Sequence, residues 1–409
     1  MECQIKNSKS FPHRFQILFG IAALVLIGCQ NPRETGRWYQ TSPSSHQELG
    51  VIVSGASKSQ IQSLNEAKQI GARTPSGPAG TYEIYGVSMD EAKTLFPGNP
   101  LSPNAFVDFN DPLTQEIQAY PTLPEQLLQL EIIQAPKAWQ QTKGANSVIS
   151  VIDTGIAWNH LDFDFQKQHP LFNEGWNFGD GNKDLTDLTA HGTAVAGLIA
   201  SSRLGVAPEA RIIPLKVINS QYKIDEASVI AAIRYSLEHN ILLIHFSLGK
   251  PNVSEVFLEL MKDVERQGAL VVAAAGNQSQ SCEQFRQYPA GLDSMSVLSV
   301  GATLLDIQNP FMYASYSNFG DCVAMAAPGG ISTLGLWAPI WQDGQSYYRS
   351  VVGTSMAAPL VSGAAALLQS IHPEWKGPEI RSFLLDTTAK SNELWGYVHS
   401  QGLLQIKLP

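Results

Sequence analysis

The feature that most constrains the fold is an alternation of apolar runs and helical segments that starts near Leu130. Several of these runs are too continuously apolar to have a face in water, which is typical of strands buried on both sides. Strands that alternate with helices predict an α/β fold, in which a doubly wound, mostly parallel sheet carries functional side chains at its carboxyl edge. The expected strands are Val148–Ile152, Arg211–Ile218, Ile241–Phe246, Ala269–Ala275, Val297–Val300 and Val323–Ala326, and the clearest helices are Asp225–His239 and Ser254–Gln267, with Ser254 as N-cap and Gly268 as the C-terminal stop.

Composition excludes several classes of protein. The chain has 409 residues, of which 44% are hydrophobic and only 15% charged, and this argues against a disordered or coiled-coil scaffold. The net charge is -9, without a run rich in Lys or Arg. Because nucleic-acid binding normally needs a basic surface, nucleic acid is not an expected partner.

The first 28 residues predict an export signal. Lys6, Lys9 and Arg14 precede an apolar run from Ile17 to Gly28, which is too short to span a bilayer. The segment ends in Leu26-Ile27-Gly28-Cys29, which resembles the lipobox of bacterial lipoproteins. That resemblance implies cleavage before Cys29, a lipid on its thiol and, because Gln30 rather than Asp follows, the outer membrane. The alternative is an ordinary signal peptide with a stray cysteine. Residues 29–48 are polar and predict a flexible tether.

Residues 49–111 predict a small α+β domain. Apolar alternation and helical spacing suggest the order β, α, β, α, β, which suits a ferredoxin-like unit. The expected strands are Leu49–Val53, Thr81–Val87 and Ala105–Phe109, with helices opening at Ser57 and spanning Met89–Phe96. Prolines at positions 112, 121 and 124 then mark a linker, and residues 112–409 form the main domain.

Four motifs in the main domain carry chemistry. Asp153 directly follows an expected strand, and Asn277 follows another. His191 opens a helical segment of small residues, and Ser355 stands where a buried helix begins. A serine, an imidazole and a carboxylate are what acyl transfer requires, and an amide can donate to the oxyanion that forms. Each motif alone is as often a helix cap as a functional group. Asp153-Thr154-Gly155 also spells the aspartic-peptidase motif, but that chemistry needs two carboxylates and no second such motif exists.

These motifs, in the order Asp, His, Ser, resemble the subtilisin-like serine peptidases over roughly Leu123 to Lys390. The resemblance implies that Asp153 orients the histidine, His191 is the general base and acid, Ser355 is the nucleophile and Asn277 the oxyanion donor. It also implies that substrate is bound by Ser247, Leu248, Gly249 and Gly276, with the segment just before Tyr288 beside the specificity pocket. Residues 49–111 look like the family's inhibitory propeptide.

Three residues depart from the family's usual pattern. Ala190 replaces the glycine often found before the histidine, Ala194 replaces a second histidine, and His245 occupies a usual asparagine. A buried, hydrogen-bonded His245 is favoured over a catalytic one.

The resulting hypothesis is an exported, lipid-anchored serine endopeptidase of the outer membrane or cell surface, made as a zymogen. Its expected partners are polypeptide substrates, its own propeptide and, through the lipid, a membrane. Catalysis is expected to need no cofactor. The rival is a catalytically silent lipoprotein that uses the same fold to bind peptides or a partner.

Two structural details stay open at the level of sequence. Cys282 and Cys322 are expected to form a disulfide after export, and the alternative is two buried free thiols. The loop Asp180-Gly181-Asn182-Lys183-Asp184, with Asp187 nearby, has oxygen spacing similar to calcium loops, whereas most acidic loops are simply solvated.

Overall fold

The computed structural model describes residues 127–168 and 174–409 in full, together with the backbone of five short strands between residues 51 and 119. The chain divides into two compact units, residues 1–37 and 38–409, and all described residues belong to the second. The expected signal peptide and the whole of the expected tether, which includes Cys29, lie outside the described residues.

The strands before residue 110 form an antiparallel four-stranded sheet in the order β2-β3-β1-β4. β1 overlaps the expected strand Leu49–Val53, and β3 lies within the expected strand Thr81–Val87; the two pair with Val51 opposite Ile84. The structure adds strands at Ala72–Arg73 and Leu101–Pro103, whereas the expected strand Ala105–Phe109 and both expected helices lie outside the described residues. The ferredoxin-like arrangement therefore stays a prediction. The bounds are β1 Val51–Ser54, β2 Ala72–Arg73, β3 Thr81–Ile84 and β4 Leu101–Pro103.

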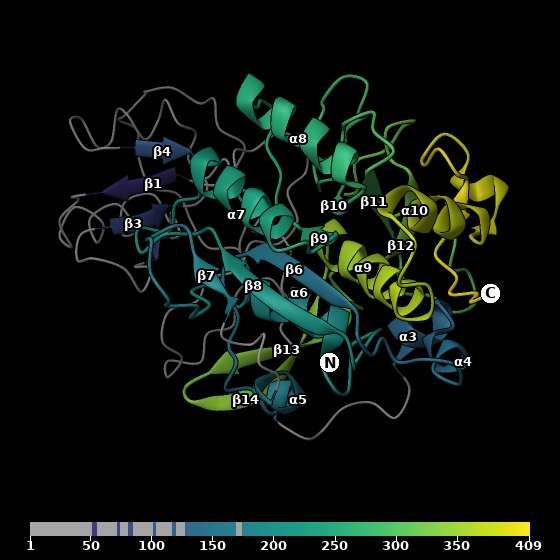
Figure 1. Cartoon of the computed structure of the whole chain (residues 1–409), viewed down its shortest axis with the longest axis horizontal. Helices are drawn as coiled ribbons and strands as arrows, with labels where there is room; N and C mark the ends of the chain where they lie inside the picture. Colours follow the sequence, from purple (N-terminus) through teal and green to yellow (C-terminus); the bar gives the residue numbers. More distant parts are fainter. Residues whose placement is uncertain are drawn as a thin grey trace, which may run out of the picture. The chain divides into compact units, whose positions relative to one another are not determined.

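The main domain is built on a nine-stranded sheet in the order β15-β16-β12-β11-β10-β9-β6-β8-β7 (Figure 1). Every neighbouring pair is parallel except β15 with β16, so the predicted mostly parallel α/β sheet is confirmed. Each of the six predicted strands matches a strand of the sheet. The strands are β6 Val148–Asp153, β7 Trp176–Asn177, β8 Arg211–Lys216, β9 Leu243–Phe246, β10 Leu270–Ala274, β11 Val297–Thr303, β12 Met325–Pro328, β15 Ala389–Lys390 and β16 Gly402–Leu403.

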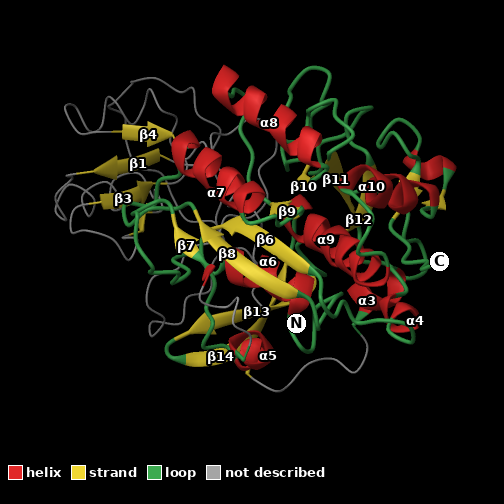
Figure 2. Cartoon of the chain, in the orientation of Figure 1, coloured by secondary structure: helices red, strands yellow, loops and turns green. Residues whose placement is uncertain are grey.

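Helices cover both faces of this sheet because successive strand residues point to opposite sides. Ile149 and Val151 of β6 pack in one core with helices α6 and α9, while Ile152 packs in a second core with α7 and α8 (Figure 2). The helices are α3 Leu128–Ile132, α4 Ala135–Ala138, α5 Asp164–Lys167, α6 His191–Ala200, α7 Glu226–Glu238, α8 Glu255–Gln267, α9 Thr354–Ile371 and α10 Gly377–Asp386. Short 3-10 turns cover Leu161–Phe163 and Asn392–Leu394.

The expected helix ends are confirmed at α8. The Ser254 side chain accepts a hydrogen bond from the Phe257 amide at 3.2 Å, and Gly268 ends the helix with a φ of 71°. At α7 the Asp225 carboxylate caps the helix by accepting from the Ser228 amide at 2.7 Å. Both caps satisfy amide groups that have no acceptor within the helix.

Helix α9 is the central helix of the larger core. Among the described residues it alone is long and apolar enough to cross a membrane, but every side chain from Thr354 to Leu368 is buried inside the protein. It is therefore a core helix of the main domain. It begins six residues before the expected apolar run at Leu360, which places Ser355 in its first turn.

A β-hairpin that the apolar pattern did not predict precedes α9. Strands β13 (Leu336–Gln342) and β14 (Gln345–Val351) pair around a two-residue turn, Asp343-Gly344, in which both φ angles are positive. β14 also pairs with β5 (Ile117–Ala119), which lies in the expected linker.

Candidate active site

Asp153 and His191 form a buried pair at the carboxyl edge of the sheet. Asp153 is the last residue of β6 and His191 the first of α6. Only 1% of the surface of Asp153 and 8% of that of His191 is exposed. Nδ1 of His191 lies 2.7 Å from Oδ1 of Asp153, which also accepts from the Thr154 amide at 2.7 Å. Because a carboxylate oxygen can only accept, Nδ1 carries the proton and Nε2 is the basic nitrogen of the neutral ring.

A second carboxylate, Asp187, holds the start of α6 against the end of β6. Its Oδ1 accepts from the Thr154 hydroxyl at 2.8 Å and from the amides of Thr189 and Ala190. Its Oδ2 accepts from the amide and the hydroxyl of Thr193 at 2.8 and 2.6 Å. Asp187 thus fixes the residues that follow Asp153 and flank His191. The sequence analysis missed this positioning role, because the N-cap of α6 is Ala190 and Asp187 lies three residues before that cap.

Ala190, immediately before His191, adopts the left-handed region with a φ of 67°. This conformation is unfavourable for alanine by about 1–2 kcal/mol but costs glycine little. We expect Ala190→Gly to stabilise the protein by about 0.5–1 kcal/mol after the larger entropy of glycine in the unfolded chain is subtracted. Equilibrium unfolding in urea, with the unchanged protein as reference, measures the effect. The matched control Ala194→Gly, inside α6, should instead destabilise by about 1 kcal/mol or more, and stabilisation by both substitutions would refute the strain argument.

Ser355 stands in the first turn of α9, directly after Thr354 and the N-cap Gly353. Its Oγ donates to the Ser247 carbonyl at 3.2 Å, and the Ser247 hydroxyl donates to the Ser355 carbonyl at 3.1 Å. The amide groups of a first helical turn have no acceptor within the helix and carry partial positive charge. An oxyanion next to Ser355 would therefore meet a favourable field.

Asn277 follows β10 and is oriented by Thr354. Its Oδ1 accepts from both the amide and the hydroxyl of Thr354, at 2.9 and 2.8 Å. The Thr354 hydroxyl in turn accepts from the Gly276 amide at 3.1 Å. These bonds assign Oδ1 to the Thr354 side of the amide, so the donor Nδ2 points to the opposite side.

The expected substrate-binding residues lie at the ends of two adjacent strands. Ser247 to Gly249 follow β9, and Gly276 follows β10, which pairs with β9 in parallel. The side chain of Leu248 is only 2% exposed and packs in the core with α7 and α8, so only its backbone can face a ligand. Glycine is required at position 276, because φ is 102° and a Cβ there would lie 2.4 Å from Nδ2 of Asn318.

Gln287 lies against both of these strand ends. A Cβ on Gly249 would lie 3.0 Å from its Oε1, and a Cβ on Gly276 would lie 3.2 Å from its Cγ. Its Nε2 donates to Oε1 of Gln278 at 3.4 Å, while its buried Oε1 has no hydrogen-bond partner among the described residues. The structure thus places the side chain just before Tyr288 beside the expected substrate-binding residues.

The carboxylates of the acidic loop accept hydrogen bonds from different partners. Asp180 accepts from Ser220, Asp184 accepts from the Thr186 amide, and Asp187 is engaged with α6 as described above. Within the described part of the chain, no group of three His, Cys, Asp or Glu side chains is placed to hold a metal ion. The calcium loop suggested by the sequence therefore stays a prediction.

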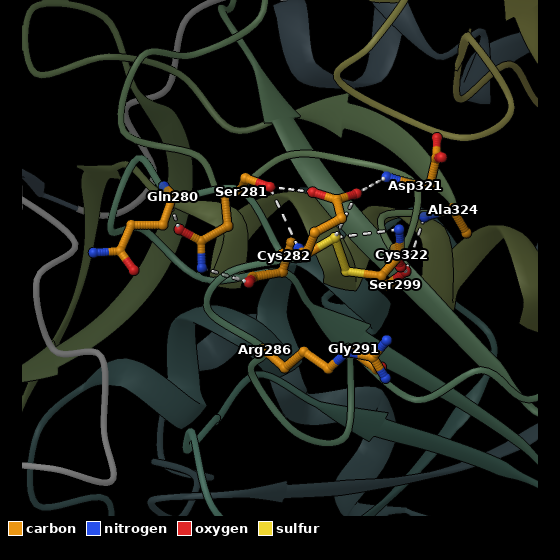
Figure 3. The surroundings of a disulfide bond; sticks show 12 residues. Gln280, Ser281, Cys282, Arg286, Gly291, Ser299, Asp321, Cys322 and Ala324 are labelled. Atoms are coloured by element: carbon orange, nitrogen blue, oxygen red, sulfur yellow. Dashed lines mark hydrogen bonds between the residues drawn. A yellow bond between two sulfur atoms is a disulfide. The ribbon is translucent and has the colours of Figure 1, made fainter.

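Cys282 and Cys322 are joined by a disulfide bond (Figure 3). The bond links the loop that contains Asn277 to the loop before β12. Beside it, the Glu283 carboxylate accepts from the Ser281 hydroxyl and from the Asp321 amide, which ties the same two loops together. The free-thiol alternative therefore does not describe this structure.

Comparison with known proteins agrees with this geometry. The model of the Subtilase family matches residues 144–402. Subtilisin DY of Bacillus licheniformis is 32% identical over 285 residues, covering 68% of this chain and 96% of the relative. The major intracellular serine protease of Bacillus subtilis (strain 168) is 32% identical over 273 residues, covering 64% of this chain and 79% of the relative. The crystal structure of a cold adapted subtilisin-like serine proteinase has a TM-score of 0.56 at 26% identity and covers 66% of this chain and 92% of that one. The chain therefore belongs to the subtilase family and is a subtilisin-like serine endopeptidase.

Proposed function

We propose that this protein hydrolyses polypeptides with Ser355 as nucleophile, His191 as general base and acid, and Asp153 as the residue that orients His191. The observation that carries the proposal is the 2.7 Å contact between Nδ1 of His191 and Oδ1 of Asp153. This pair lies at the carboxyl edge of the sheet, and Ser355 lies in the first turn of α9. Nδ1 must carry the proton that it donates to Asp153, so Nε2 is the nitrogen that can take the serine proton.

The proposed reaction has two halves, acylation and deacylation of Ser355. Ser355 Oγ attacks the peptide carbonyl carbon while Nε2 of His191 accepts its proton, and Asp153 stabilises the imidazolium that results. The carbonyl oxygen becomes an oxyanion, which accepts from Nδ2 of Asn277 and from the Ser355 amide. The tetrahedral intermediate collapses as Nε2 returns the proton to the leaving amine. Water then attacks the acyl carbonyl carbon while Nε2 of His191 accepts its proton. The second tetrahedral intermediate collapses as Nε2 returns this proton to Ser355 Oγ, and the carboxylic acid product leaves. Apart from the water, these steps use only side chains and amides of this chain.

Reaction with a fluorophosphonate tests the proposal against its rival, a silent lipoprotein that only binds peptides. An activated serine is phosphonylated covalently, whereas an ordinary serine is not. We expect the purified protein to be labelled with one probe per chain. Absence of labelling in a folded protein would favour the silent binder.

Loss of the proposed oxyanion donor is expected to slow catalysis. Asn277→Ala removes Nδ2 and should lower kcat by about 10²–10³-fold, because the charge on the oxyanion develops only on the way to the transition state. KM should change little, since the uncharged substrate carbonyl gains little from this donor. Steady-state hydrolysis of a fluorogenic peptide provides both constants. A raised KM with unchanged kcat would instead make Asn277 a residue that binds the ground state.

We further propose that the protein is exported, carries a lipid on Cys29 and is made as a zymogen with residues 49–111 as its propeptide. The support is the basic and apolar signal that ends at Cys29, together with the family membership of the domain that follows. On this proposal the catalytic domain works in the outer membrane or at the cell surface.

The order of the domains predicts release from the membrane. Cys29 precedes the expected propeptide, so self-cleavage between about residues 111 and 130 would separate the catalytic domain from the covalent anchor. We expect membrane fractionation to find the catalytic domain in the soluble fraction for the unchanged protein and in the membrane fraction for Ser355→Ala. Equal membrane retention in both would exclude release by self-cleavage.

A further inference from the structure

A second histidine, His245, lies in the core beside the Asp153–His191 pair. It belongs to β9, where it is opposite Val151 of β6 and Val272 of β10, and its side chain is completely buried. Both ring nitrogens are in short hydrogen-bonding contacts: Nδ1 lies 2.7 Å from Oγ of Ser362, and Nε2 lies 2.6 Å from Oγ of Ser247. The proposed mechanism does not use this imidazole.

The periodicity of the strand and of the helix brings four side chains together: His245, Ser247, Ser355 and Ser362. His245 and Ser247 are two residues apart along the chain at the end of β9, so both point to the same side. Ser355 and Ser362 are seven residues apart on α9, which is two helical turns and therefore one helix face. His245 thus bridges the strand end and the helix that carry Ser247 and Ser355.

Hydrogen-bond direction assigns one state to the whole chain of contacts. The Ser355 carbonyl can only accept, so the Ser247 hydroxyl donates its one proton to this carbonyl, at 3.1 Å. Ser247 Oγ must then accept from His245, which places a proton on Nε2. In a neutral ring Nδ1 is consequently the acceptor, and the Ser362 hydroxyl donates to it. Every donor in this series of hydrogen bonds has an acceptor. The Ser355 hydroxyl completes the series by donating to the Ser247 carbonyl at 3.2 Å.

We propose that His245 is a positioning residue for the nucleophile, which acts by holding the Ser247 hydroxyl on the Ser355 carbonyl and thereby fixes Ser355 between β9 and α9. The inference rests on Ser355 being the nucleophile. His245 must be neutral for this role, because protonation of Nδ1 would remove the acceptor of Ser362. Burial lowers the pKa of His245 to about 3; the charge of Asp153 opposes this shift and that of His191 adds to it. Neutrality therefore holds across the range in which a histidine base works.

Two substitutions of His245 separate its hydrogen bond from its bulk. His245→Leu keeps an apolar side chain in the core but cannot bond to Ser247, whereas the amide nitrogen of His245→Gln reaches about the position of Nε2 and can donate to Ser247. Ser362→Ala keeps the imidazole but removes the donor that keeps its proton on Nε2. Because the Ser362→Ala change is small and leaves the packing in place, it provides the test if His245→Leu fails to fold.

Fluorophosphonate labelling followed over time gives the readout. A merely structural defect lowers the fraction of protein that is labelled, whereas a misplaced Ser355 lowers the rate constant of labelling. We expect the rate constant and kcat to fall about tenfold in His245→Leu, which corresponds to about 1.4 kcal/mol, and to fall in the same direction in Ser362→Ala, with KM little changed. His245→Gln should restore most of the rate. Rate constants equal to that of the unchanged protein in His245→Leu and Ser362→Ala would overturn the positioning role, while absence of labelling in the unchanged protein would instead overturn the proposed function.

Discussion

Replacing Ser355 with alanine is expected to lower kcat by roughly 10⁶-fold, an effect that only replacement of His191 should match. Ser355 Oγ is the only protein atom that bonds to the substrate carbon in the proposed mechanism, so without it water must attack the peptide directly, with no acyl-enzyme. Residual catalysis by the oxyanion site should remain above the uncatalysed rate. Hydrolysis of a fluorogenic peptide at saturating concentration measures the loss.

The matched control for this substitution is Ser370→Ala. Ser370 lies on the same helix, and its hydroxyl donates to the Leu367 carbonyl far from the sheet edge that carries Asp153. We expect its kcat to stay close to that of the unchanged protein. If Ser355→Ala kept a comparable kcat while remaining folded, another residue would have to be the nucleophile.

Replacing Asp153 with alanine is expected to lower kcat by about 10⁴-fold, less than the loss of Ser355 or His191. The carboxylate makes two contributions through one oxygen: Oδ1 binds the Nδ1 proton of His191 and accepts from the Thr154 amide. Without it the imidazole can rotate or change tautomer, and the imidazolium that forms during acylation loses its counter-charge. Because substrate contacts are untouched, we expect the change in kcat rather than in KM, measured with the same peptide.

Asp162 offers a control with the same chemistry and burial. It lies nine residues after Asp153, is likewise 1% exposed, and accepts from the Tyr348 hydroxyl at 2.8 Å. Burial is the main reason that the pKa of Asp162 is raised to about 6, whereas Tyr348, Arg203 and Ser202 act to lower it. Asp162→Asn keeps an oxygen for Tyr348 and should leave kcat nearly unchanged. Equal losses in both variants would mean that removal of any buried carboxylate in this loop disturbs the site.

The sheet was predictable from the sequence because its signals are local, and so were the strand ends that Asp153 and Asn277 follow. Continuous apolar runs marked the buried strands, and Asp153 and Asn277 each follow such a run. Ser254 and Gly268 were recognisable as the ends of α8 because capping depends on a few neighbouring residues.

What the sequence did not predict depends on contacts between distant segments or on conflicting local signals. The β13–β14 hairpin contains Pro339, which argues against a strand, although Asp343-Gly344 is a strong signal for a type I′ turn. Asp187 looked like part of an acidic loop, and only the packing of α6 against β6 turns its carboxylate towards Thr154 and Thr193. The contact between His245 and Ser362 joins residues 117 positions apart, which no local pattern could indicate.

The central claim is that Ser355 is the nucleophile of a working endopeptidase. Its most direct test is tandem mass spectrometry of a proteolytic digest after reaction of the purified protein with a fluorophosphonate, because fragment masses locate the adduct on one residue. The account predicts a single phosphonylated residue, Ser355, and no adduct when the His191→Ala variant is treated under the same conditions. An adduct on a different serine, or peptide hydrolysis that persists with Ser355 fully phosphonylated, would contradict it.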